Sequence, residues 1–256
     1  MRAPAPGVLV RGAAIAAPVW DEADLTDCVF EDCDFGGGRL AGAVLAGARF
    51  VRCRLAGCTF RHADLREARF EGCVLARPPD DQGAAFAFAR LDEASFTGCD
   101  LRRASFEGAD LYAARFSDCN LMGAAFDKAR FHRAFSRTVV RTAVSFLDCN
   151  LELAELAQAR LPGCALTRCR LREANLTGAD LEGADLSGSD LFQAVLDGAR
   201  LAGADLSGAE VSGLDLRRLA AFEGVRIRPD QQFRLLEAMG LDVVVDSERG
   251  GKPAPD

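Results

Sequence analysis

A leucine recurs at every fifth residue over a long stretch of this sequence. Between Ala174 and Gly208 (ANLTGADLEGADLSGSDLFQAVLDGARLAGADLSG) the leucines run from Leu176 to Leu206. A period of five matches neither the 3.6-residue period of a helix nor the two-residue period of a strand, so neither element buries these leucines in one stripe. A fixed short period indicates a solenoid. We therefore expect a chain that turns a corner every five residues and coils on itself.

The same register covers most of the chain. It runs over residues 25–75, 86–131 and 146–216, with 36 centres that are all Leu or Phe except Val211. Phe and Leu alternate strictly between Phe50 and Leu75, so four repeats in each turn would stack Phe on Phe twenty residues later. The expected structure is a four-sided coil of about nine turns, spaced like neighbouring β-strands at about 4.8 Å.

The cysteines occupy one position of the repeat. All ten stand two residues before a centre, where 22 of the 36 positions hold Ala. Neighbouring cysteines such as Cys28 and Cys33 are five residues apart, which is not the C-x₂-C spacing of a zinc site. We therefore interpret them as small, buried and reduced, which fits a cytoplasmic protein.

Composition argues against several classes of function. The net charge is −7 and the pI about 5.1, unlike a basic nucleic-acid binder, and no apolar run is long enough for a membrane helix. The two histidines, His62 and His132, share no motif with a cysteine or carboxylate at ligand spacing. With no nucleophile beside a base and no phosphate loop, we expect no enzyme activity, no cofactor, no metal and no direct contact with nucleic acid or membrane.

The motif Ala-Asp-Leu-x-Gly, at Ala179–Gly183 and Ala204–Gly208, resembles that of pentapeptide-repeat proteins. This resemblance implies an all-β fold, a right-handed quadrilateral β-helix. The expected order is an N-terminal segment or cap (1–22), a first coil stack (23–131), an irregular break (132–145) and a second coil stack (146–216). A C-terminal helix and dimerisation module (217–246) and a disordered tail (247–256) follow.

Two segments interrupt the register. Residues 76–85 add one residue to two repeats, and their turn chemistry predicts an extruded loop made by Pro78, Pro79, Asp80, Asp81 and Gln82. Residues 132–145 lose their centres but keep the phase, which predicts a bend or hinge with candidate residues Phe135, Arg137 and Arg141. Each segment is either a plain insertion or kink, or a surface that contacts a partner.

The C-terminal segment predicts a short helix over the open end of the coil. Pro229 suits a helix start and Gly240 a helix end. This helix has more apolar residues than the face that packs on the coil can bury. The remaining apolar residues suggest a two-fold contact with a second copy. The candidate dimer residues are Phe233, Leu236, Met239, Leu241 and Val243.

The ending contains four short motifs: Val225-Arg-Ile, Gln231-Gln232, Leu235-Leu236-Glu237, and Met239-Gly240-Leu241 followed by valines. Together they resemble the ending of the Qnr, MfpA and AlbG group of pentapeptide-repeat proteins. The resemblance implies a cytoplasmic homodimer that binds bacterial gyrase or topoisomerase IV and protects it from poisons such as quinolones. It therefore implies a role in antibiotic resistance or in the self-immunity of a producer.

Acidic residues are concentrated near this ending. Residues 175–215 hold eight acids and one base, Arg200. Such a surface could imitate the dense charge of a DNA duplex, or could simply keep an Asp-rich repeat soluble. The candidate partner-binding acids are Asp180, Glu182, Asp185, Asp190, Asp197, Asp205 and Glu210. The alternative function is a scaffold or adaptor of unrelated role.

Overall fold

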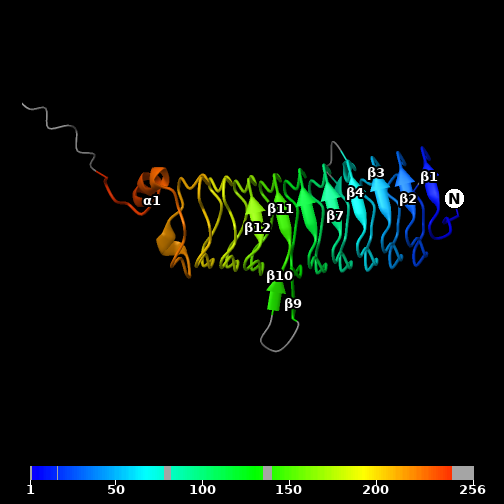
Figure 1. Ribbon diagram of the computed structural model, residues 1–256. Helices are drawn as coiled ribbons and strands as arrows, with labels where there is room; N and C mark the ends of the chain where they lie inside the picture. The colour runs from blue at the N-terminus through cyan, green and yellow to red at the C-terminus, as the bar shows by residue number, and fades with distance from the viewer. Residues whose placement is uncertain (1, 16, 78–81, 135–139, 244–256) are drawn as a thin grey trace, which may run out of the picture.

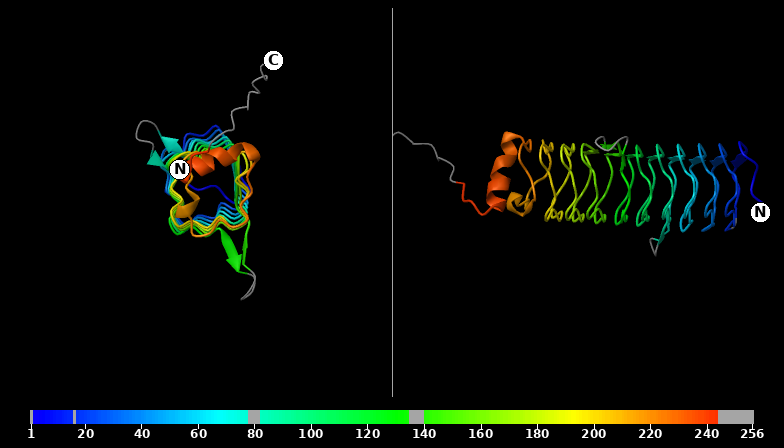
Figure 2. Two further views of the ribbon diagram at one scale, coloured as in Figure 1. Left: turned by 90° about the vertical axis from the view of Figure 1, so that its left-hand side faces the viewer. Right: turned by 90° about the horizontal axis from the view of Figure 1, so that it is seen from below.

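The computed structural model describes residues 2–15, 17–77, 82–134 and 140–243. The chain forms one straight rod with a square cross-section (Figures 1 and 2). The strands are β1 (Leu9–Arg11), β2 (Val29–Glu31), β3 (Arg49–Val51), β4 (Arg69–Glu71), β5 (Ala76–Arg77), β6 (Gln82–Gly83), β7 (Ser95–Thr97), β8 (Arg115–Ser117), β9 (His132–Ala134), β10 (Val140–Thr142), β11 (Ser145–Leu147) and β12 (Ala165–Thr167). Near the C-terminus come η1 (Leu216–Arg218), η2 (Pro229–Gln231) and α1 (Gln232–Ala238).

One side of the rod, here called the first face, is a parallel sheet. Among the described residues its strands follow the order β1-β2-β3-β4-β7-β8-β11-β12. Neighbours pair in register, as Phe30 with Phe50 and Phe50 with Phe70, so each turn takes twenty residues. Seven turns separate β1 from β12, and isolated bridges extend the ladder to Asp185 and Asp205. The four-sided solenoid is thus confirmed, with a coil count slightly different from nine.

The corners of the square explain the polar residues of the repeat. The second residue after most centres adopts positive φ, for example Gly203 at +69° and Asp148 at +53°. Gly, Asn and Asp tolerate this conformation better than most residues. The Asp before a centre accepts a hydrogen bond from the backbone two residues later, as Asp185 Oδ1 does from Ser187 N at 2.9 Å. Such Asx turns stabilise each corner locally.

The core consists of the centres and the small residues that precede them. Phe70, Phe96 and Phe116 are fully buried and stack in successive turns, with ring centroids 4.6 and 4.9 Å apart and planes within 5°. Aromatic stacking adds to the free energy gained by burial of the rings. The expected alignment of Phe on Phe is therefore present in the rod.

The cysteines form a ladder inside the rod. All ten are unpaired and buried. Seven of them stack in successive turns, namely Cys33, Cys53, Cys73, Cys99, Cys119, Cys149 and Cys169. The thiol of Cys73 donates to the carbonyl of Phe50 at 3.2 Å, and that of Cys99 to Phe70 at 3.3 Å. A small side chain with a weak donor thus fits this position, as the sequence indicates.

The coil begins earlier than residue 23. Strand β1 pairs with β2, with Leu9 opposite Val29, and Ile15 and Trp20 are buried at centre positions. The segment 1–22 is therefore mostly the first turn of the coil and not a separate cap. The sequence pattern missed it because Ile and Trp replace Leu and Phe, and because prolines interrupt the motif.

The coil is one stack and not two. Phe116 pairs with Phe146 in the sheet although thirty residues separate them, and their rings stack at 4.9 Å. The excess residues leave the coil as an antiparallel hairpin, β9–β10, which projects from one corner (Figures 1 and 2). The expected bend at 132–145 is therefore wrong. Strands β5 and β6 form a smaller antiparallel pair at a different corner, where the sequence predicts an extruded loop.

The C-terminal end also differs from the expected boundary at residue 216. The coil continues beyond it, since Ala221 bridges to Arg200 and Arg226 to Asp205. Helix α1 then lies across the open square (Figure 2) and buries Leu235. The buried Gln231 side chain donates to the carbonyls of Leu206 and Ala209 at 2.7 and 2.8 Å. The capping helix is thus held by backbone groups that the last full turn leaves without a next coil.

Candidate partner-binding surfaces

The seven candidate acids lie around the last turns of the rod. Asp185 and Asp205 are neighbours on the first face, and Asp190 and Glu210 are neighbours on the next. Hydrogen bonds from Ser207 hold the pKa of Asp205 below its ordinary value, and Ser212 lowers the pKa of Glu210 in the same way. These two carboxylates therefore stay charged well below neutral pH.

Arginines from neighbouring turns neutralise much of this surface. Arg200 pairs with Glu182 at 3.1 Å and lies 3.9 Å from Asp180, while Arg172 reaches Asp190 at 3.3 Å. Asp197 pairs with Arg218, Asp205 with Arg226 and Glu210 with Arg234. Asp185 is the one acid of the set without an arginine partner among the described residues.

A charge count along the sequence missed these arginines. Arg218, Arg226 and Arg234 lie outside the window 175–215 but fold onto it, with 21 or 24 residues between partners. The signal that could have found them is the twenty-residue period itself, extended past residue 216. The surface is thus less negative than the window suggests.

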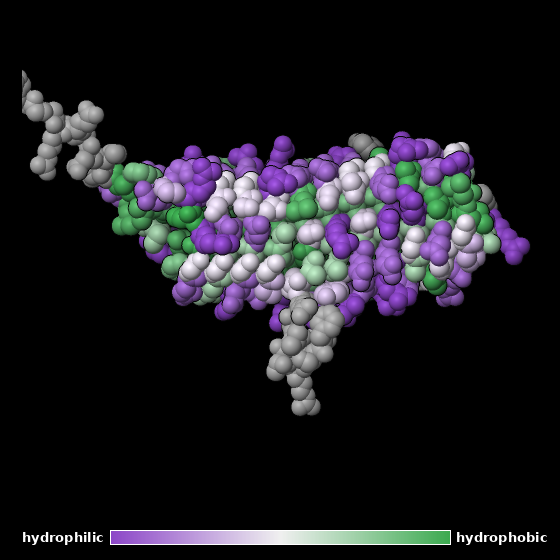
Figure 3. Space-filling model, in the orientation of Figure 1, coloured by the Kyte–Doolittle hydropathy of each residue, from purple (hydrophilic) through white to green (hydrophobic). Residues whose placement is uncertain are grey.

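The candidate dimer residues lie at the C-terminal end of the rod. Phe233 is 38% exposed and Leu241 51% exposed, while Leu236, Met239 and Val243 are half-buried. Val243 is not in a strand. Figure 3 shows hydrophobic residues gathered at this end of the molecule. Phe222 and Ile227 in the last turn are also about two-fifths exposed, at 40% and 38%. The exposed apolar surface at this end of the rod therefore includes Phe222 and Ile227 in addition to the candidate dimer residues.

The candidate loop residues are only partly described. Pro78, Pro79, Asp80 and Asp81 lie outside the described residues, as do Phe135 and Arg137. Gln82 belongs to β6, opposite Arg77, and Arg141 to β10, opposite Arg133. The hinge assigned to Phe135, Arg137 and Arg141 does not fit, because this segment is the projecting hairpin and not a joint in the coil.

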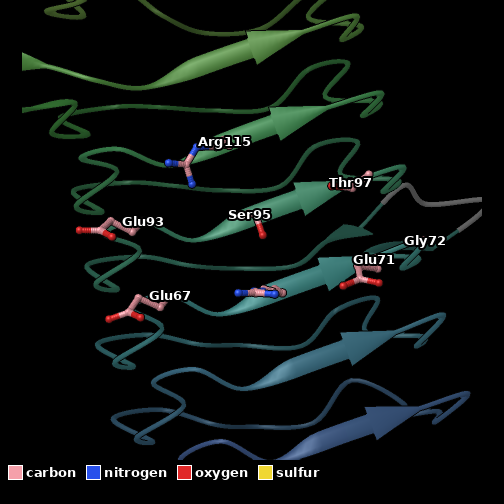
Figure 4. A pocket seen from close by; sticks show the side chains of 8 residues that line it. Glu67, Glu71, Gly72, Glu93, Ser95, Thr97 and Arg115 are labelled. Carbon is pink, nitrogen blue, oxygen red and sulfur yellow. The ribbon is translucent and has the colours of Figure 1, made fainter.

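The first face carries a shallow depression of about 530 Å³. In Figure 4, Glu67 and Glu93 lie along one rim, Ser95 and Arg115 lie on the strands, and Glu71 is at the opposite side. This lining mixes charges of both signs and holds no nucleophile with an adjacent base. No sequence pattern indicates this depression, because its residues come from separate turns.

The two histidines lie in different parts of the rod. His62 stacks on Phe88 with ring centroids 5.3 Å apart, and His132 lies in β9. Within the described ranges, no group of three or more His, Cys, Asp or Glu side chains could hold a metal ion. The same part of the chain contains no helix long and apolar enough to cross a membrane.

Comparison with known proteins gives a family and a structural relative. The family model for pentapeptide repeats matches in eight copies, over residues 23–61, 39–77, 82–118, 104–135, 149–188 and 184–218. A trypsin-treated variant of QnrB1, a plasmid-mediated fluoroquinolone resistance protein, is 25% identical. The match covers 93% of this chain and 99% of that one, with a TM-score of 0.66. Full-length QnrB1, at 22% identity and a TM-score of 0.61, covers 91% of this chain and 100% of its own. No curated protein sequence matches the chain.

Proposed function

The chain belongs to the pentapeptide-repeat family, and from this premise we propose that it binds a bacterial type II topoisomerase and protects it from fluoroquinolone-type poisons. The partner is gyrase or topoisomerase IV. The observation that carries the proposal is the match to QnrB1 over 93% of this chain and 99% of the other. The match to QnrB1 covers more of the chain than residues 23–218, over which the family model for the repeats matches. The similarity therefore extends toward both ends of the rod.

The charge of the C-terminal turns supports a duplex-like role. B-DNA carries one charge per ~1.7 Å of helix axis, or about three charges over the ~4.8 Å of one coil. Residues 180–199, one turn of the rod, carry five acids and no base. Arg172, Arg200 and Arg218 reduce this charge by pairing. Five acids less these three arginines leave about two net charges on this turn, compared with about three for DNA over the same length, and with this charge the rod can compete for a basic groove that normally holds a duplex.

The exposed apolar end supports a homodimer. Phe233 and Leu241 would lose their exposed surface against the same end of a second copy. Two rods joined in this way form a longer rod with the acidic turns at its middle. In size-exclusion chromatography, Phe233→Asp is therefore expected to elute at half the mass of the wild type, because a charge would be buried without a partner. Equal masses for the two proteins would contradict the dimer.

The function is tested with gyrase supercoiling in the presence of a fluoroquinolone. Titration of the protein is expected to restore supercoiling that the drug blocks, and to inhibit the enzyme at higher concentration. No effect on supercoiling in either direction, with gyrase and with topoisomerase IV decatenation, would refute the proposal.

Matched variants test the acidic surface. The triple change Asp185→Asn, Asp190→Asn and Asp205→Asn removes three charges but keeps an acceptor for each Asx turn. The control removes three charges at equivalent repeat positions in earlier turns, with Asp24→Asn, Asp64→Asn and Asp110→Asn. At about 0.5 kcal/mol for each exposed charge, the first triple should require about tenfold more protein for half-maximal protection. The control triple should require about the same amount as the wild type.

One observation favours the alternative of a scaffold or adaptor. The ion pairs across the last turns leave Asp185 as the acid without an arginine partner among the described residues. A scaffold would use such pairs for solubility and stability alone. Equal protection by both triple variants would favour a role that does not depend on the acidic surface.

A further inference from the structure

The hairpin β9–β10 stands outside the core of the rod. The chain leaves the coil after the buried Phe131 and returns at the buried Val144. Beneath the hairpin, Phe116 and Phe146 stack directly, so the coil is closed without it. Its described part consists of three antiparallel pairs, from His132–Thr142 to Ala134–Val140. A hairpin of this size is marginal by itself in water, so a fixed direction requires a contact with the coil.

Arg133 supplies that contact. Its guanidinium forms an ion pair with Asp92 and lies over the ring of Tyr112, with the Cζ atom 4.5 Å from the ring centroid. Asp92, Tyr112 and His132 occupy the same repeat position in three successive turns, twenty residues apart. The Arg133 side chain therefore lies back along the outside of the rod, across one turn and onto the next.

The burial of Asp92 makes this contact strong. Its side chain is only 7% exposed, whereas the carboxylate of Asp32 in its ion pair with Arg52 is 54% exposed and that of Asp110 in its pair with Arg130 is 18% exposed. The second oxygen of Asp92, Oδ2, has no hydrogen-bond partner in the described part of the chain. A buried carboxylate is costly without a counter-ion. Movement of the hairpin would remove Arg133 and leave that charge buried and unpaired.

We propose that Asp92 and Tyr112 are positioning residues that hold Arg133, and through it the hairpin β9–β10, in one direction relative to the rod. Strands β9 and β10 are thereby presented to the topoisomerase in a fixed direction, which reduces the entropy lost on binding. This second part rests on the proposed function. The first part concerns the free protein alone.

The free protein tests the positioning role by hydrogen–deuterium exchange. In Asp92→Asn and Arg133→Gln, amides of 132–134 and 140–142 are expected to exchange about tenfold faster than in the wild type, while those of the coil at 95–106 keep their protection. The coil amides report whether each variant still folds. The control is Asp32→Asn, which breaks a bidentate ion pair far from the hairpin, with N–O distances of 2.7 Å. Unchanged exchange at 132–134 and 140–142 in both Asp92→Asn and Arg133→Gln would overturn the proposal.

A gyrase protection assay tests the presentation of the hairpin. Asp92→Asn is expected to need about tenfold more protein for half-maximal protection, and Asp32→Asn the same amount as the wild type. Faster exchange with unchanged protection would overturn the role in partner binding. Absence of protection by the wild type would refute the proposed function, whereas the exchange result would still decide the positioning role.

Discussion

Truncation of Phe116 tests whether the rod is one continuous coil. The ring is fully buried and stacks on Phe96 and on Phe146, each at 4.9 Å, and its edge contacts Phe106 at 5.8 Å. Phe→Ala in a core costs about 3–5 kcal/mol, and each lost aromatic pair about 0.5–1.5 kcal/mol beyond burial. We expect Phe116→Ala to lower the free energy of unfolding by about 5 kcal/mol. Phe116→Leu, which keeps most of the volume, should lower it by about 2 kcal/mol.

Urea unfolding followed by circular dichroism measures both values. The wild type should unfold in one transition, and the variants should move its midpoint without a change of slope. The control is Val44→Ala, at a position 37% exposed, which should change stability by less than about 0.5 kcal/mol. A loss below about 1 kcal/mol for Phe116→Ala would refute the stacking across the hairpin. If the unfolding curve had two steps and Phe116→Ala shifted the midpoint of only one of them, the rod would consist of two independent coil stacks.

Two further perturbations test the interior and the cap. Burial raises the pKa of Cys58 to about 12 and that of Cys169 to about 11, so iodoacetamide at pH 8.5 should leave both unmodified in the native protein and label them after denaturation. Because these pKa values are raised in the folded state, the associated stability is complete below the ordinary thiol pKa near 9 and falls as the pH rises above it. A urea midpoint at pH 10 that equals the one at pH 7, or native labelling, would contradict the sealed interior. Gln231→Ala removes bonds to Gly208, Leu206 and Ala209 and should cost about 2–3 kcal/mol because buried backbone groups lose their partners. The exposed Gln232→Ala is its control, and equal melting temperatures for the two would show that Gln231 does not hold the cap.

The sequence predicts the coil well because each core position can be recognised from its own five-residue repeat, without knowledge of contacts between residues far apart in the chain. Each centre and each small residue is specified within five residues, and the Asx turns and positive-φ corners are specified just as locally. The ends and the break were less predictable. At the N-terminus Ile15 and Trp20 do not match the motif, and at 132–145 an insertion of ten residues leaves the phase of five unchanged. A kept phase therefore does not distinguish a continued coil from an extruded hairpin.

The candidate surfaces were predictable only in part. The sequence indicates the acids of residues 180–210, but their partners Arg218, Arg226 and Arg234 become visible only when the last turn is folded. The contact of Arg133 with Asp92 spans 41 residues and depends on the hairpin, so no local pattern reports it. The exposed Phe233 and Leu241 and the buried Leu235 follow from the placement of α1 across the open coil.

Competition with DNA for the topoisomerase tests the central claim most directly. The affinity of the labelled protein for gyrase is measured by fluorescence anisotropy, first alone and then with increasing concentrations of a linear DNA duplex. If the rod occupies the groove of the enzyme that normally holds the DNA duplex, the apparent Kd of the rod for gyrase should rise in proportion to DNA concentration. The triple Asp→Asn variant should bind about tenfold more weakly. An apparent Kd that DNA does not change, for a protein that still binds gyrase, would contradict the account.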